Sequence, residues 1–375
     1  MSEHSAVPDI AILASFSGEG GVERMLVNLA NEFAERNHRV HLLLIKSTSR
    51  HLKELHPGVE AISLGSRHTA TSLLPLISYL RAHRPARMLV VKDRAGRLAV
   101  RARALAGTET RLVLRLGTNL SASLKHRNLF QRWLRLWPIR HAYPKLDHII
   151  AVSKGVADDT ISLSGVAAAK VSVIRNPVLT PRVRELAQSA APHPWLKEKT
   201  LPVVIGAGRL TFQKDFATLI RAFSRLSEKR QLRMIILGEG DQRSALQALI
   251  DELGLHDKVD LPGFAENPYA YMARADLFVL SSRWEGSPNV LTEAMLLGVP
   301  VVATDCPSGP AEILQNGRIA PLVPMGDWRQ LADAMESILT SPPDSALLVD
   351  AVKDYTVETS ADGYLAALGL GSNTL

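Results

Sequence analysis

Two glutamates spaced eight positions apart are the residues that most directly suggest chemistry. Glu285 and Glu293 lie in the stretch SSRWEGSPNVLTEAMLLGVPVVAT, residues 281–304, among mostly apolar or small neighbours. Carboxylates are costly to bury without partners, so this pair predicts a polar ligand. A proline in the first turn and a glycine at the end predict a helix from Pro288 to Gly298, which places Glu285 in the loop before it and Glu293 on it. Three backbone N–H groups of its first turn would face an anion: those of Asn289, Val290 and Leu291.

A second cluster combines two cations with a glycine turn. The stretch GAGRLTFQKDF, residues 206–216, places Arg209 and Lys214 just past an expected strand and beside a helix start near Asp215. Two cations and backbone N–H groups at such a point would hold a diphosphate. The alternative is two surface cations on a loop, but cations at a helix N-terminus oppose the helix dipole. We therefore favour the diphosphate site.

Two glycine-rich turns could bring backbone close to a ligand. The first is SFSGEGGVE, residues 15–23, and the second is GEG, residues 238–240. The first turn has neither the G-x-G-x-x-G spacing of a dinucleotide-binding fold nor the Lys-Ser/Thr of a P-loop. An ordinary strand–helix turn explains it equally well, and the second turn is weak evidence by itself.

Short apolar segments alternate with amphipathic helical patterns such as that of residues 20–38. Strand, helix and strand in succession predict parallel sheets with right-handed crossovers. The pattern restarts after residues 176–202, whose five prolines predict a linker, so we expect two tandem α/β domains. Ligands of such sheets bind beyond the carboxyl ends of the strands. The expected strands are 9–15, 39–45, 86–92, 111–116, 148–153, 203–208, 232–238, 259–263, 276–282 and 300–304.

Charge is distributed unevenly along the 375 residues. The net charge is +7, but residues 1–180 carry +13 and residues 181–375 carry −6. Residues 81–145 hold 16 basic and 2 acidic side chains. Such a field favours an anionic partner, namely nucleic acid, anionic lipid or a phosphorylated acceptor, over a merely solvated basic surface.

Cysteine content and hydropathy indicate the compartment. The single cysteine, Cys306, excludes an intrachain disulfide and fits a reducing, cytoplasmic setting. The first residues lack a signal-peptide pattern, and no apolar run is long enough to span a bilayer. We expect a cytoplasmic protein, with peripheral contact to the inner face of the cytoplasmic membrane as a further hypothesis.

Four segments resemble, in order, the retaining glycosyltransferases of family 4. EGSPNVLTE followed by AMLLGVPVVATDCPSGPAEIL resembles their E-x7-E signature, and GGVERMLVNLANEFAERNHRVHLLL resembles their N-terminal glycine loop and first helix. AVSKGVADDT with KVSVIRNPV, in residues 151–178, resembles their interdomain entry, and GRLTFQKDFATLIRAF resembles their diphosphate site. The resemblance covers most of the chain and implies the GT-B fold, in which two Rossmann-like, doubly wound parallel-sheet domains face an interdomain cleft. The implied parts are an acceptor-binding domain, 1–180, a sugar-nucleotide-binding domain, 181–355, and a segment packing back on the first domain, 356–375.

The resemblance also implies roles for single residues. Arg209 and Lys214 would clamp the diphosphate of a sugar nucleotide and neutralise the leaving group, while Glu285 would hydrogen-bond the donor sugar. Glu293 would accept bonds from both ribose hydroxyls. The remaining implied donor contacts are Gly20, Gly21, Gly238, Gly263, Phe264, Gly286, Ser287, Pro288, Asn289, Val290 and Leu291. No D-x-D pair occurs in a suitable loop, so we expect neither a metal nor another cofactor, with cations and helix N-termini stabilising the departing diphosphate.

Two positions depart from the family pattern. Many members have a histidine after the strand corresponding to 111–116, where this chain has Gly117, Thr118 and Asn119. Asn119 is a candidate contact to the sugar or the acceptor. The common E-G-F-G is E-G-S-P at 285–288, and this change alters what touches the sugar. The donor base and sugar, the acceptor and the linkage therefore do not follow from the residues.

The stretch HRNLFQRWLRLWPIRHAYPK, residues 126–145, has an apolar stripe at helical spacing with arginines between. It could lie on an anionic membrane face with its aromatic residues at the interface. Alternatively, the stripe packs on the first domain's sheet and the arginines are solvated, which is the commoner fate of an amphipathic helix. The membrane-facing candidates are Arg127, Arg132, Trp133, Arg135 and Trp137.

The features together predict transfer of a hexose-type sugar from a nucleotide-diphosphate sugar to a glycan or lipid-linked acceptor in bacterial cell-surface polysaccharide synthesis. Three other GT-B enzymes are alternatives: a soluble-acceptor transferase, a phosphorylase and an epimerase. A further alternative is a module that only binds sugar nucleotide, or binds nucleic acid through its basic half. No nucleic-acid motif of recognisable spacing occurs, so we expect no nucleic-acid partner.

Overall fold

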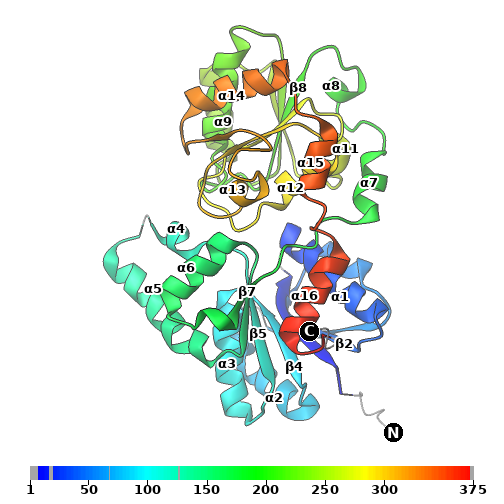
Figure 1. The fold of residues 1–375 in the computed structure, drawn as a ribbon, viewed down its shortest axis with the longest axis vertical. Helices are drawn as coiled ribbons and strands as arrows, with labels where there is room; N and C mark the ends of the chain where they lie inside the picture. Colours follow the sequence, from blue (N-terminus) through cyan, green and yellow to red (C-terminus); the bar gives the residue numbers. More distant parts are fainter. Residues whose placement is uncertain (1–6, 17–19, 67, 126, 372–375) are drawn as a thin grey trace. The chain divides into compact units, whose positions relative to one another are not determined.

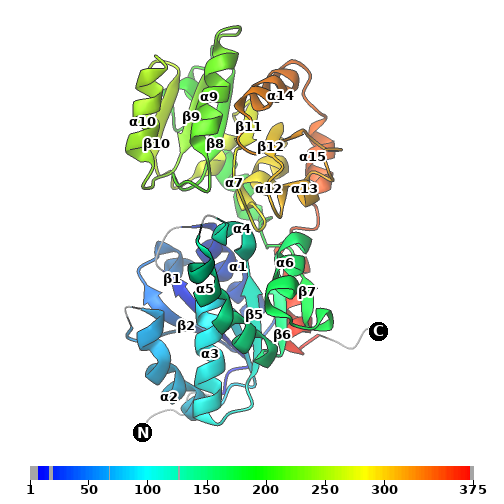
Figure 2. The ribbon, with the colours of Figure 1, turned by 90° about the vertical axis from the view of Figure 1, so that its left-hand side faces the viewer.

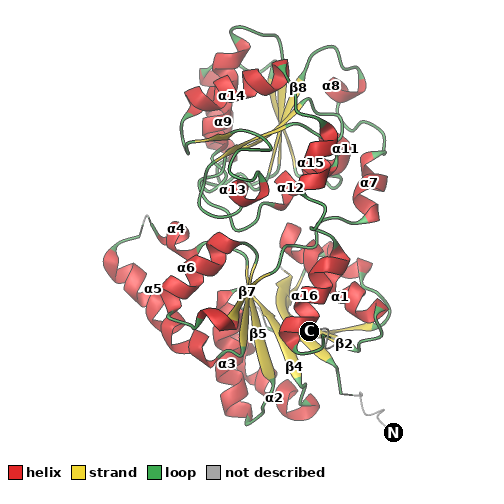
Figure 3. Cartoon of the chain, in the orientation of Figure 1, coloured by secondary structure: helices red, strands yellow, loops and turns green. Residues whose placement is uncertain are grey.

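The computed structural model describes residues 7–16, 20–66, 68–125 and 127–371, and it divides into two compact α/β units. One unit comprises Met1–Pro177 together with Thr356–Leu375, and the other comprises Val178–Tyr355. The chain therefore passes from one unit to the other twice. Each unit alternates strands and helices, as Figure 3 shows by colour.

The first unit is built on a parallel sheet of seven strands, counted over the described residues, in the order β3-β2-β1-β4-β5-β6-β7. Its inner strands are continuous apolar runs because both faces of the sheet are covered. The edge strands β3 and β7 are half exposed, and neither shows such a run in the sequence. The strands are β1 (Ile10–Phe16), β2 (Val40–Ser47), β3 (Val59–Ser63), β4 (Arg87–Val91), β5 (Arg111–Leu116), β6 (His148–Ala151) and β7 (Val171–Val173).

Helices cover both faces of this sheet, and each face has its own hydrophobic core (Figures 1 and 2). One core contains side chains of α2, α3 and α6, and the other contains side chains of α1 and α16. The helices are α1 (Gly21–Glu35), α2 (Leu73–His83), α3 (Asp93–Ala106), α4 (Leu120–Leu124), α5 (Leu129–Ala142), α6 (Lys154–Ser164) and α16 (Val357–Leu368).

The last helix, α16, belongs to the first unit although it ends the chain. Tyr364 is fully buried in the same core as α1. Arg87 and Arg111, on two strands of the sheet, donate side-chain hydrogen bonds to the carbonyls of Leu368 and Ala367. The helix ends at Gly369, whose φ of 78° suits glycine.

The second unit has a parallel sheet in the order β10-β9-β8-β11-β12-β13. The order reverses between β8 and β11, so the loops after these two strands border the crevice where such sheets bind ligands. The strands are β8 (Val203–Ala207), β9 (Arg233–Leu237), β10 (Val259–Gly263), β11 (Leu277–Leu280), β12 (Val301–Thr304) and β13 (Leu322–Val323). The helices are α7 (Pro181–Ala187), α8 (Pro194–Lys197), α9 (Phe216–Ser227), α10 (Arg243–Glu252), α11 (Pro268–Met272), α12 (Asn289–Leu296), α13 (Pro310–Ile313), α14 (Trp328–Thr340) and α15 (Ser345–Ala351).

The linker expected over residues 176–202 is wrong for most of that stretch. Two of its prolines lie in the first turns of α7 and α8, where proline is favoured. Val183 and Leu196 are buried in the core of the second unit. The N–H groups of Val178 and Leu179 both donate to the carbonyl of Tyr355, so the segments that enter and leave this unit lie side by side.

Candidate active site

The loops that follow β8, β9 and β10 interlock through backbone contacts. Gly208 donates its N–H to Leu237, at 2.9 Å, and Gly238 donates to Gly263, at 2.8 Å. Gly238 has a φ of 138°, and a Cβ there would lie 1.9 Å from the carbonyl oxygen of Gly208. A close approach of two loops therefore explains why the GEG turn contains glycine.

A buried ion pair joins the two candidate loops at the carboxyl ends of β8 and β11. Lys214 Nζ lies 2.5 Å from Glu285 Oε1, and the Ser282 hydroxyl donates to the same oxygen at 2.7 Å. Both charged side chains are more than four-fifths buried. Charges taken this far from water need close partners, and each supplies the other's.

A second layer of contacts holds these loops against each other. Asp215 has a left-handed backbone, with φ of 48°, and its Oδ2 accepts from Arg283 at 2.9 Å and from Thr218 at 2.9 Å. Gln213 donates its side-chain amide to the Trp284 carbonyl and accepts the Arg283 N–H at its own carbonyl. The sequence analysis missed these partners, because their spacing along the chain has no motif.

The floor beneath Glu285 comes from the loop after β12. The Glu285 N–H donates to the Pro307 carbonyl at 3.2 Å, and a Cβ at Gly309 would lie 2.7 Å from Pro288. Burial raises the pKa of the Cys306 thiol, and the Glu285 charge raises it further. The only cysteine is therefore a protonated, inert part of this floor.

Arg209 lies in the same loop as Lys214 but behaves differently. Its side chain is exposed, and within the described part of the chain it has no ion pair. The structure therefore brings Lys214 and Glu285 together and leaves the Arg209 guanidinium in solvent beside them. A cation with this freedom can bind an anionic ligand without first breaking a protein contact.

Glu293 lies on α12, as expected, and is 2% exposed. Its Oε1 accepts a hydrogen bond from the Tyr269 hydroxyl, at 3.2 Å, from α11. The sequence analysis did not single out Tyr269, which lies in the second unit and orients this carboxylate. The first-turn amides are only partly available, because the Leu291 N–H donates to the Pro288 carbonyl at 3.1 Å. Leu291 thus fits the expected anion contact less well than its two predecessors.

In the first unit, Gly20 and Gly21 start α1, with Gly20 as its N-cap. A Cβ on Gly20 would lie 3.2 Å from the Glu23 carboxylate, which is buried and lies 3.7 Å from Lys92 Nζ. An acidic side chain thus already occupies the first turn of this helix, where the helix dipole favours negative charge. Residues 17–19 of the same turn lie outside the described residues.

Asn119 caps a helix. Its side-chain Oδ1 accepts the Ala122 N–H at 2.9 Å, which makes it the N-cap of α4. Asparagine is among the preferred residues at this position. The structure therefore gives Asn119 a local role in the loop that lacks the family histidine.

The membrane-facing candidates divide into two groups. Trp133, Trp137 and Arg127 are exposed. Arg135 points the other way, because its guanidinium lies 2.9 Å from the buried Asp93 at the start of α3, and Arg132 is partly buried. The expectation that all five face outward is wrong for Arg135.

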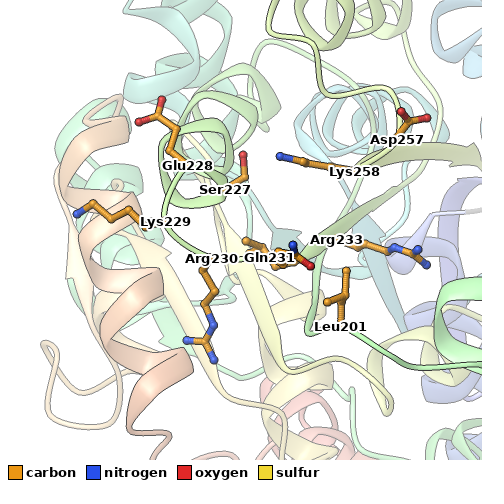
Figure 4. Close-up of a pocket in the computed structure, with 10 residues that line it drawn as sticks. Leu201, Ser227, Glu228, Lys229, Arg230, Gln231, Arg233, Asp257 and Lys258 are labelled. Atoms are coloured by element: carbon orange, nitrogen blue, oxygen red, sulfur yellow. The ribbon is translucent and has the colours of Figure 1, made fainter.

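A surface pocket of about 410 Å³ lies at the amino ends of strands of the second sheet (Figure 4). Its lining includes Arg230, Arg233 and Lys258, which come just before or at the amino ends of β9 and β10. The donor candidates follow the carboxyl ends of the strands, so this pocket is not the candidate site. Among the described residues, no group of three or more His, Cys, Asp or Glu is arranged to hold a metal ion, and no helix is long and apolar enough to cross a membrane.

Two Rossmann-like units with parallel sheets define the GT-B class of fold, and the cation–carboxylate cluster lies at the strand ends of the second unit, where such sheets bind ligands. Residues 19–182 match the family description "Glycosyltransferase Family 4", and residues 188–354 match "Glycosyl transferases group 1". The chain belongs to the family 4 glycosyltransferases, which confirms the resemblance inferred from its motifs.

Relatives of this chain include several bacterial enzymes. It is 31% identical over 330 residues to N-acetylgalactosamine-N,N'-diacetylbacillosaminyl-diphospho-undecaprenol 4-alpha-N-acetylgalactosaminyltransferase of Campylobacter jejuni, covering 86% of this chain and 87% of that protein. It is 26% identical to a lipopolysaccharide core biosynthesis glycosyltransferase of Rhizobium meliloti, covering 94% and 97%. An Anabaena protein, HepE, solved with UDP and glucose, shares the fold at a TM-score of 0.77 and 20% identity, covering 96% and 99%. The chain is thus a glycosyltransferase similar to those of lipopolysaccharide and polysaccharide synthesis.

The interlocked loops predict a large cost for Gly238→Ala. The new Cβ would collide with the Gly208 carbonyl in addition to straining the backbone. Gly254→Ala is the matched control, since Gly254 has a φ of 63° with nothing within 4 Å of the new Cβ. The control should cost about 1–2 kcal/mol of unfolding free energy, and Gly238→Ala about 2 kcal/mol more. Urea unfolding measures both, and equal costs would contradict the close approach.

The ion pair predicts strong coupling between its members. Lys214→Met should cost about 3 kcal/mol of unfolding free energy, because it leaves the Glu285 carboxylate buried without its cation. Glu285→Gln added to Lys214→Met should recover about 1–3 kcal/mol. A double-mutant cycle by urea unfolding measures the coupling, and strictly additive costs would show that the pair is not coupled.

Proposed function

We propose that this glycosyltransferase is a retaining enzyme that moves a hexose-type sugar from a nucleotide-diphosphate sugar to a glycan or lipid-linked acceptor. The observation that carries the proposal is the clustering of Lys214, Ser282 and Glu285 where β8 and β11 end. Such a cluster offers a cation to the diphosphate and a carboxylate to the sugar within one site.

The contacts of Glu285 support its role toward the donor sugar. Lys214 and Ser282 both donate to Oε1, whereas no residue of the described chain donates to Oε2. That second oxygen is available to a sugar hydroxyl. Because Oε1 already has two donors, the carboxylate is held in one orientation and suits positioning better than nucleophilic attack. The acceptor hydroxyl would then attack from the face that the diphosphate leaves, which retains the anomeric configuration.

The contacts of Lys214 support its role toward the leaving group. A lysine ammonium has three N–H donors, and the bond to Glu285 uses one of them. The other donors can bind phosphate oxygens without breaking the pair. Together with the exposed Arg209, Lys214 would neutralise the charge that grows on the diphosphate as the glycosidic bond breaks. We propose that these fixed cations perform this task without a metal or other cofactor.

Glu293 and Tyr269 support binding of the nucleoside. An ionised carboxylate has about four lone-pair sites, and the Tyr269 bond to Glu293 Oε1 uses one of them, which is compatible with bonds from ribose hydroxyls. The Anabaena protein that shares this fold was solved with UDP, which supports a nucleotide as the ligand here. Gly263 ends β10 and the exposed Phe264 follows it, and both are proposed to lie near the base.

Relatives support the acceptor class. The Campylobacter jejuni enzyme is named for a diphospho-undecaprenol-linked acceptor, and the Rhizobium meliloti enzyme for the lipopolysaccharide core. We propose a glycan or lipid-linked acceptor for this chain, in the cytoplasm at the inner face of the cytoplasmic membrane. The basic surface of residues 81–145 would favour an acceptor that carries phosphate.

A donor panel tests the proposal. The protein is incubated with UDP-, GDP- and ADP-sugars and lipid-linked acceptors, with and without EDTA, and products are read by mass spectrometry and anomeric NMR. We expect transfer from one donor class, retention at the anomeric carbon and no effect of EDTA. Sugar release that depends on free phosphate would indicate a phosphorylase, and binding without transfer or hydrolysis would indicate a binding module.

Loss of the ribose contact should weaken donor binding. Glu293→Ala should cost about 2–4 kcal/mol of binding free energy for the nucleotide, since charge-assisted bonds to two hydroxyls are lost. Tyr269→Phe should cost about 1 kcal/mol, because only the bond that orients the carboxylate is lost. Calorimetry with the nucleotide measures both, and unchanged affinity of Glu293→Ala would refute the ribose role.

Loss of the solvent-facing cation should slow the chemical step. Arg209→Ala should lower kcat by about 100-fold with a smaller change in KM, because leaving-group charge is greatest in the transition state. Lys258→Ala is the control, since it removes a cation from the pocket at the amino ends of the strands of the same sheet. Steady-state kinetics distinguish them, and an equal loss in both variants would point to net charge instead of position.

A further inference from the structure

Five large apolar side chains of α5 face solvent. They share one side of the helix, because positions 129, 133 and 137 are four residues apart and positions 130 and 134 lie beside them. We call this set the α5 apolar face. Its members are half or more exposed: Leu129 (81%), Phe130 (69%), Trp133 (57%), Leu134 (59%) and Trp137 (50%). The alternative in which this stripe packs on the sheet is therefore wrong.

The opposite side of α5 is held firmly by the first unit. Ile139 is fully buried, and Leu136 packs against the core that contains α3 and α6. Arg135 pairs with the buried Asp93 of α3, and Arg140 donates to the Leu163 carbonyl of α6. The apolar face is thus exposed because the helix is fixed the other way round.

The surroundings of the α5 apolar face are strongly basic. None of the 14 residues of α5 is acidic. Lys125 and Arg127 are exposed in the segment just before it. Residues 81–145 contain 16 basic side chains and only two acidic ones, and one of these two, Asp93, is already paired with arginines. An apolar strip near exposed cations is complementary to a surface that has an apolar interior and an anionic boundary.

We propose that the α5 apolar face docks the enzyme on an anionic lipid bilayer, with the helix lying in the plane of the membrane. Tryptophan suits the headgroup boundary, and leucine and phenylalanine suit the acyl region below it. The 14 residues of α5 span about 21 Å, less than the hydrocarbon core of about 30 Å, so the helix lies along the bilayer. The inference deepens the proposed function, because a lipid-linked acceptor lies in such a bilayer.

The charge also argues against a second copy of the chain as the occupant. A symmetric contact through this face would bring two surfaces of the same positive sign together, and their repulsion opposes association. A bilayer rich in anionic headgroups instead gains about 1 kcal/mol for each lysine or arginine near its surface. If the parent does not float with anionic vesicles, an acidic protein surface becomes the favoured occupant instead.

Vesicle flotation without donor or acceptor tests the docking independently of transfer. The full chain should float with vesicles of phosphatidylglycerol and phosphatidylcholine, and far less with phosphatidylcholine alone. Phe130→Ser/Trp133→Ser/Trp137→Ser should lower the partition coefficient at least tenfold. Leu74→Ser/Leu105→Ser is the matched control, because these leucines are 75% and 57% exposed on α2 and α3, and it should float like the parent. Lys125→Gln and Arg127→Gln should each lower the partition roughly fivefold.

A fluorescence measurement locates the contact. Vesicles with brominated acyl chains should quench tryptophan emission of the parent, which has five tryptophans. Trp133→Leu/Trp137→Leu keeps the face apolar, so it should still float but lose the quenching. Melting temperature confirms that each variant is folded.

The outcomes separate this inference from the proposed function. Equal flotation of the parent and the triple serine variant would overturn the docking role of α5 and leave the transferase proposal untouched. A dimer in sedimentation that the triple variant dissociates, or absence of flotation by the parent, would also overturn it. Flotation of the parent with no transfer in the donor panel would leave the docking role standing and refute the function.

Discussion

The proposed donor site depends on one buried pair of opposite charges. Lys214 and Glu285 come from loops 71 residues apart in the sequence, and each is the close opposite charge that the burial of the other requires. The pair therefore fixes the distance between the loops after β8 and β11. Everything that a sugar nucleotide would touch in the second unit is arranged around this distance, including the exposed Arg209 on one loop and the start of α12 after the other.

The loop after β9 satisfies that constraint by having a glycine, Gly238, at its point of contact with the loop after β8. Where the backbone of Gly238 approaches the Gly208 carbonyl, residue 238 cannot carry a Cβ. Three contacts join the loop after β8 to the loop after β11: the Arg283 ion pair with Asp215, the bond from the Gln213 side-chain amide to the Trp284 carbonyl, and the bond from the Arg283 N–H to the Gln213 carbonyl. The result is a rigid set of strand ends, which suits a site that must hold charge before the reaction begins.

Much of the fold could be predicted from the sequence. Nine of the ten predicted strands are inner strands, and the tenth, β10, lies at a sheet edge but is bounded by clear turns. The three strands that were not predicted, β3, β7 and β13, also lie at sheet edges and are too short or too exposed to show an apolar run. The proline-rich stretch misled because proline starts α7 and α8 as readily as it interrupts a helix.

The site was predictable in its charged residues and less so in their partners. Lys214, Glu285 and Glu293 stood out because charge among apolar neighbours is visible in one segment. Tyr269 and Asp215 did not, because their roles depend on contacts across the sheet. The helix of residues 129–142 was a different case, since periodicity defines an apolar stripe but not which side of the helix the protein covers.

The placement of α16 has a consequence for the order in which the molecule is made. One face of the first sheet is covered by α1 and by the last helix of the chain. During synthesis the ribosome releases that helix only after the whole second unit has emerged. The second unit can therefore close its own core first, while the earlier-made unit keeps an apolar patch uncovered until α16 has emerged. The first unit is therefore the first to be synthesised but the second to complete its hydrophobic core.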